Sequence, residues 1–174
     1  ATKLSGALPA IDGSALTGMP AGGKVLQVVQ ATDATQINTS LTTSEVDLPL
    51  LGTITPTSSS SKILVMLTTW MGYNPNGGVY LKRGSTKIGG HGLAGNYNTP
   101  DDFWCTDDLS NVYAVHSISY TYLDTPNTTS ATTYRIGLKN GDGMTSGEIS
   151  YNRAWNGVTS GAGRSTITLM EIGV

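Results

Sequence analysis

The sequence predicts an all-β protein, a single antiparallel β-sandwich resembling a jelly roll and preceded by an extended N-terminal arm. Apolar and polar residues alternate in several short runs, and clusters of turn residues separate these runs. No window shows an apolar period of 3.6 residues, so no helix is expected. The 174 residues divide into an arm, residues 1–23, and a β-sandwich domain, residues 24–174.

The arm differs from the rest of the chain in composition. Residues 4–23 read LSGALPAIDGSALTGMPAGG, which contains too much Gly and Pro for a helix and almost no charge. The segment is too short to bury its own apolar side chains, so we expect it to be ordered only along other subunits. The residues expected to make these assembly contacts are Leu4, Leu8, Ile11, Leu16 and Met19.

The first half of the domain predicts four strands, at residues 24–30, 46–55, 62–70 and 79–83. Pro49 indicates that the second of these lies at a sheet edge or carries a bulge, because proline cannot donate a ladder hydrogen bond. The third is almost continuously apolar, which is typical of a strand buried on both faces. The run from Asn74 to Gly78 predicts the turn before the fourth strand.

The second half of the domain predicts three alternating strands, at residues 117–123, 133–139 and 165–172. Residues 89–112 are expected to form one long loop. Asn140–Gly143 reads NGDG, which accepts the positive φ angles of a tight hairpin and predicts one there. Asn38–Ser40 and Asn127–Thr129 match glycosylation acceptors, but without a secretory signal we interpret both as turns.

Composition and charge exclude several classes of partner. The net charge is −2, so the chain lacks the basic footprint of a protein that binds nucleic acid or an anionic membrane. No apolar stretch approaches the roughly 20 residues needed to cross a bilayer. Cys105 is the single cysteine, so an intrachain disulfide is impossible.

Motifs for catalysis and cofactors are weak. Gly90–Gly95 matches G-x-G-x-x-G, but the following Asn96–Pro100 cannot open the helix that a nucleotide site needs. Cys105, His91 and His116 match no known nucleophile motif. We therefore expect no enzyme, no catalytic residue and no cofactor.

Two features of the predicted loop remain open between a binding role and a structural one. Four carboxylates, Asp101, Asp102, Asp107 and Asp108, would suit a hard cation, but an acidic surface loop can equally be solvated, and no metal is assigned. Tyr97 and Trp104 offer flat apolar area for surface recognition of a sugar or protein, or they close one end of the sandwich.

Several segments resemble surface proteins of tailed bacteriophages. They are the arm, the strand start GKVLQVVQ, the block HSISYTYLDTPNTTSATTYRIGLK and the ending STITLMEIGV. The resemblance covers most of the chain. It implies a homotrimer of β-sandwich domains on the outer surface of a virion.

Three roles follow as alternatives. The chain has no room for a fibre shaft and begins with Ala, as after loss of an initiator Met, so we expect a capsid decoration (cement) protein that contacts the major capsid protein or other virion proteins. A tail-fibre tip that binds a host glycan or receptor, expressed as a fragment, would look the same. A carbohydrate-binding module or glycan-degrading spike would need paired carboxylates facing a groove, and the loop Asp101–Asp108 is the only dense supply.

Overall fold

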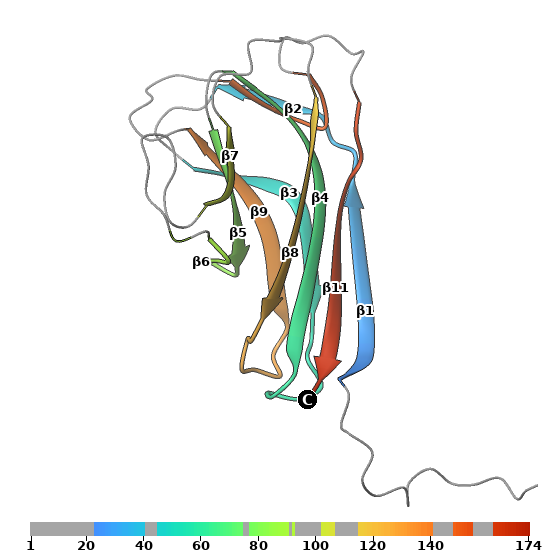
Figure 1. The fold of residues 1–174 in the computed structure, drawn as a ribbon. Coiled ribbons are helices and arrows are strands. Elements are labelled where there is room, and N and C mark those ends of the chain that lie inside the picture. The colour runs from blue at the N-terminus through green and yellow to red at the C-terminus, as the bar shows by residue number, and fades with distance from the viewer. Residues whose placement is uncertain are drawn as a thin grey trace, which may run out of the picture.

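A computed structural model contains two antiparallel β-sheets and no helix among the residues it describes, which confirms the predicted all-β class (Figure 1). These residues are 23–40, 45–74, 77–90, 92, 102–106, 115–140, 148–154 and 162–174. Within them, no helix is long and apolar enough to span a membrane. The strands are β1 (Lys24–Asp33), β2 (Ile37–Ser40), β3 (Val46–Ile54), β4 (Lys62–Asn74), β5 (Gly77–Arg83), β6 (Thr86–Ile88), β7 (Asp102–Thr106), β8 (His116–Asp124), β9 (Thr132–Asn140), β10 (Glu148–Tyr151) and β11 (Ser165–Gly173).

The first sheet, which we call sheet A, is built around β4. Strand β8 pairs along one edge of β4, and β11 and then β10 pair along the other edge. Met71 pairs with both β8 and β10, which places these two strands on opposite sides. Strand β1 continues the sheet beyond β11, and β2 continues it beyond β10, so sheet A is four strands wide.

The second sheet, sheet B, has the order β3, β9 and β5, with β7 and β6 following one another along the far edge of β5. Sheet B is therefore also four strands wide. Strand β3 lies at its edge, and the β3–β9 register shifts between Asp47 and Leu51, around Pro49. Both observations confirm the edge and the bulge that this proline predicts.

One hydrophobic core fills the space between the two sheets. Strand β3 of sheet B contacts both β1 and β11 of sheet A, and the core takes side chains from every long strand. Inward side chains of β4, such as Val65, are buried, whereas the alternate ones are partly exposed. The prediction that this strand is buried on both faces is therefore wrong, because sheet B covers only one face. The largest fully buried apolar core side chains are Tyr134, Tyr151, Leu48, Leu50, Ile54, Ile63, Met71, Leu81 and Ile136.

Three local predictions differ from the structure. Asn38–Ser40 belongs to β2, where Asn38 accepts a hydrogen bond of 3.0 Å from the Ser150 hydroxyl of β10, so it is not a turn. The predicted hairpin at Asn140–Gly143 is wrong, because β9 lies in sheet B and the following β10 lies in sheet A. The predicted loop 89–112 contains β7, which pairs with β5. In each case a distant strand supplies the pairing partner, which local turn chemistry does not specify. The second acceptor match lies in the connection between β8 and β9, where Asn127 has a positive φ of 52°.

Two buried carboxylates hold the layers together. Glu171 of β11 accepts hydrogen bonds of 2.7 Å from the amide and hydroxyl of Thr57 and of 2.6 Å from Gln27. Burial alone would raise the pKa of Glu171, but the bonds from Gln27 and Thr57 lower it to about 2. The charged form is therefore the stable one, and it fixes the segment after β3 against β11 and β1.

The second carboxylate, Asp124 of β8, links sheet A to sheet B. The Arg83 guanidinium of β5 donates to its two oxygens at 2.8 and 2.9 Å, and the Tyr134 hydroxyl of β9 donates at 2.6 Å. Burial and the adjacent carboxylate raise the pKa of Tyr134 above its ordinary value. Since its two partners come from the opposite sheet, this carboxylate fixes the relative position of the layers.

Candidate functional site

Most residues predicted from the sequence to act in assembly or recognition lie outside the described residues. These are Leu4, Leu8, Ile11, Leu16, Met19 and Tyr97. Trp104 lies in β7, where its backbone pairs with Val79 of β5. The structure does give the place where the arm joins the domain. Lys24 opens β1 opposite Gly173 of β11, so the arm meets the domain beside the C-terminus (Figure 1).

The residues considered for catalysis or metal binding do not form a common site in the described ranges. Asp102 lies in β7, and Asp101, Asp107, Asp108 and His91 lie outside these ranges. Cys105 is in β7 of sheet B, whereas His116 opens β8 of sheet A opposite Met71. In the described part of the chain, no group of three or more His, Cys, Asp or Glu side chains is placed to hold a metal ion.

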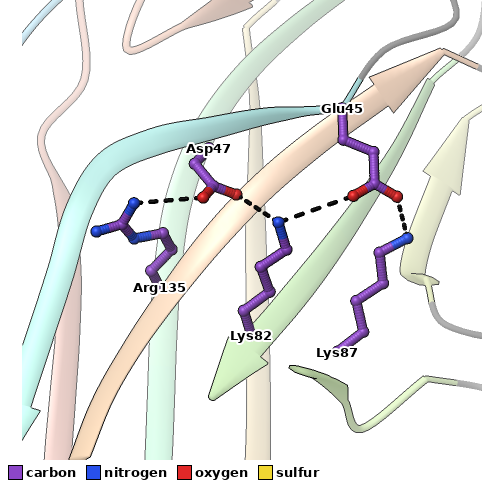
Figure 2. A network of polar contacts seen from close by, with 5 residues as sticks. All are labelled: Glu45, Asp47, Lys82, Lys87 and Arg135. Carbon is purple, nitrogen blue, oxygen red and sulfur yellow. Dashed lines mark hydrogen bonds and ion pairs between the residues drawn. The ribbon is translucent and has the colours of Figure 1, made fainter. Parts of the chain in front are cut away.

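A network of five charged side chains covers the face of sheet B that points away from the core (Figure 2). Its members are Glu45, Asp47, Lys82, Lys87 and Arg135. Asp47 lies between Lys82, at 2.8 Å from Nζ, and Arg135, at 3.3 Å from Nη1. Glu45 lies between Lys82, at 3.7 Å, and Lys87. Each carboxylate is thus flanked by two cations, which come from the strands β5, β6 and β9.

The network rests on an aromatic side chain. Tyr80 of β5 is fully buried on this outer face, and the Nζ atoms of Lys82 and Lys87 lie 5.0 and 4.6 Å from its ring centroid. Gly137 of β9 pairs with Tyr80, and a Cβ there would overlap the ring. The glycine therefore makes room for the ring, which in turn supports both ammonium groups through cation–π contacts.

The electrostatics of this network favour fixed charges. Burial would raise the pKa of Asp47, but hydrogen bonds and charges from Lys82 and Arg135 bring it below its ordinary value. Burial, followed by the carboxylates of Glu45 and Asp47, raises the pKa of Tyr80. At neutral pH the Tyr80 phenol therefore stays protonated and the Asp47 carboxylate stays ionised. The arrangement can hold a fixed charge pattern on the surface.

The outer face of sheet A has the opposite character. Its cross-strand pairs form three rows that run from β1 over β11 and β4 to β8. The rows are Val28–Met170–Leu64–Leu123, Gln30–Thr168–Met66–Thr121 and Thr32–Thr166–Thr68–Ser119. We call these twelve residues the neutral face, because none of them is charged. Val28 and Leu123, at the two ends of the first row, remain 54 % and 48 % exposed.

Neither surface was identified from the sequence, although each leaves a signal there. The outward positions of the strand around residues 117–123 carry Ser, Ser, Thr and Leu, where a hydrated face would carry Lys or Glu. Lys82 and Arg135 occupy the outward positions of two other alternating strands. Joining such positions into one surface requires the strand order, which alternation alone does not provide.

Neither of two comparisons with known proteins gives a match to this chain. A scan against protein-family models finds no matching family. A search of curated proteins finds no significant match.

Proposed function

We propose that this chain is a structural protein of a bacteriophage virion, a homotrimeric capsid decoration (cement) protein that attaches through its N-terminal arm and stabilises the shell. The observation that carries the proposal is the neutral face, which lies on a domain whose N-terminal arm is itself apolar and nearly uncharged. A surface that carries exposed apolar side chains and no charge at its centre favours contact with other protein subunits. The resemblance of the segments to tailed-phage surface proteins supplies the setting.

We also propose that the two-sheet domain is a jelly roll, and the order of pairing supports this. We count β1–β2, β6–β7 and β10–β11 as one interrupted strand each, which leaves eight strands. The first then pairs with the eighth, the second with the seventh, the third with the sixth and the fourth with the fifth. This nested pairing is what two interlocked Greek keys produce, and the jelly roll is common in viral capsid proteins.

Opposite surfaces of the domain suit the proposed location. Sheet B carries the charged network on its outer face, whereas the neutral face and the arm are available for protein contacts. A trimer built in this way would present sheet B to solvent on the particle. No described group has to perform chemistry in this role.

Attachment to capsids tests the proposal. Purified protein is mixed with capsids that lack it, and co-sedimentation is compared between the full chain and a variant without residues 1–23. We expect the full chain to sediment with capsids and the shortened chain to remain in the supernatant while its circular dichroism still reports a folded β domain. Equal sedimentation of both proteins would contradict attachment through the arm.

A further inference from the structure

We infer that the neutral face of sheet A is the surface through which copies of this chain pack against one another. The inference deepens the proposed function and rests on its homotrimer, since it names the contact surface that such an assembly needs. The binding partner on this face is another copy of this chain.

The centre of the neutral face carries no charge. Across the three described rows the outward side chains are Val, Leu, Met, Thr, Ser or Gln, and charges occur only at the margins. Lys62 pairs with Ile172 at one end, and the Arg164 guanidinium lies 3.5 Å from the Thr32 hydroxyl at the other. An uncharged centre with a charged rim is the composition of a protein–protein interface.

An exposed sheet edge lies beside these rows. Strand β1 is paired on one side by β11, and Val25 and Leu26 are 55 % and 46 % exposed. Between Lys24 and Asp33 the strand carries no charge, although exposed edge strands normally carry charges that prevent association. Among the described residues no strand pairs with the other side of β1, so the apolar row that contains Val28 and Leu123 ends there at an uncharged edge.

The area of the neutral face can be compared with that of a standard protein interface. Strands about 4.8 Å apart and residues about 3.3 Å apart make a patch about 20 Å by 25 Å, once Val25, Ile172 and Trp70 are added to the rows. A standard interface buries about 800 Å² per partner, and a patch of these dimensions with its side-chain relief supplies most of that area. The three rows and their margins therefore form the central part of a contact of standard size.

The choice of a second copy follows from charge. Three copies of a neutral surface can gather around a three-fold axis without repulsion between like charges, and their apolar rows then lie next to one another at that axis. The outer face of sheet B is unsuited to the same contact, because Lys82, Lys87 and Arg135 outnumber Glu45 and Asp47 in its network. Two copies meeting through sheet B would bring net positive charge together.

Matched substitutions on the two sheets test the inference in the full chain. Leu123→Lys places a charge in the neutral face, and Leu51→Lys makes the same change at a 38 % exposed position on the outer side of sheet B. Sedimentation equilibrium should show self-association of the wild type and of Leu51→Lys, and at least tenfold weaker association of Leu123→Lys. Thr121→Lys, in the adjacent row, should repeat the loss, and near-ultraviolet circular dichroism checks that each variant is folded.

Oxidative footprinting then locates the contact. Met66 and Met170 lie in the neutral face, and the fully buried Met71 serves as an internal reference. Hydroxyl-radical oxidation of Met66 and Met170 should rise several-fold in Leu123→Lys relative to wild type, while that of Met71 stays unchanged.

Three results would overturn the inference. They are a monomeric wild type, association of Leu123→Lys equal to wild type, or protection of Met66 that persists in a monomeric variant. The last would show that another segment, such as the chain's own arm, covers the face. Capsid binding is scored separately. If Leu123→Lys leaves the trimer intact and the protein still binds capsids, only this contact surface is wrong. If Leu123→Lys breaks the trimer but the wild type never binds capsids, only the virion role is wrong.

Discussion

Glu171 stabilises the fold through its ionised form. Its pKa of about 2 lies below the ordinary value of 4.5, because donors from Gln27 and Thr57 outweigh the effect of burial. An acid with a lowered pKa stabilises the fold above its unfolded pKa, and this stability is lost as the pH falls toward the folded pKa. The contribution at neutral pH is on the order of 3 kcal/mol.

We therefore predict that Glu171→Gln lowers the free energy of unfolding at pH 7 by about 2–3 kcal/mol. Between pH 5 and pH 2 the wild type should lose stability more steeply than the variant. Urea unfolding followed by circular dichroism at several pH values measures both effects. Glu45→Gln, at a partly exposed acid of the charged network, is the control and should change stability by less than about 1 kcal/mol. Parallel pH profiles for wild type and Glu171→Gln would contradict the prediction.

At Gly137 the packing of the Tyr80 ring requires a residue without a Cβ. Because its added Cβ would overlap the Tyr80 ring, Gly137→Ala should destabilise the protein by about 1–3 kcal/mol, as overpacking does elsewhere. In the Tyr80→Ala background the ring is absent, and the same substitution should cost markedly less. Additive losses in this double-mutant cycle, measured by thermal unfolding, would show that the ring is not the cause.

At the scale of elements, the contact among β5, β8 and β9 couples the two sheets through Asp124. Asp124→Ala leaves the Arg83 guanidinium and the buried Tyr134 hydroxyl without this acceptor, so we predict a loss of about 3–5 kcal/mol. Tyr134→Phe removes one hydrogen bond and should cost about 1–2 kcal/mol. Denaturant titration distinguishes the two variants, and equal losses would contradict a carboxylate-centred link.

The sequence predicts long elements of this fold well and short ones poorly. The alternation from residue 133 to 139 matches β9, and Pro49 correctly marks the edge strand β3. Strands β2, β6, β7 and β10 have only three to five residues, too few for a periodic signal, and partners far along the chain hold them in place. The pairing of β10 with β4 instead of β9 likewise depends on contacts that no local turn encodes.

The candidate site could be predicted only in part. The predicted assembly residues of the arm lie outside the described residues and stay predictions. Both surfaces found on the domain combine side chains from three or four strands, so they appear only once the register is known. Leu64, for example, joins Leu123 and Met170 in one row although its own run reads simply as an apolar strand.

On the scale of the whole molecule, the two faces of the domain are chemically opposite, and this asymmetry suggests a component of a larger assembly. The proposed decoration role predicts that particles lacking the protein lose heat resistance while they retain adsorption to host cells. Infectivity after a heat step, compared with adsorption to cells without heating, measures the two properties separately. Normal heat resistance combined with lost adsorption would favour a tail-fibre tip over a decoration protein.

The central claim is that this chain is a self-associating building block. Sedimentation equilibrium of the purified full chain at several concentrations tests it most directly. We predict a species with three times the mass of one chain, and a single monomeric species throughout the concentration range would contradict the claim.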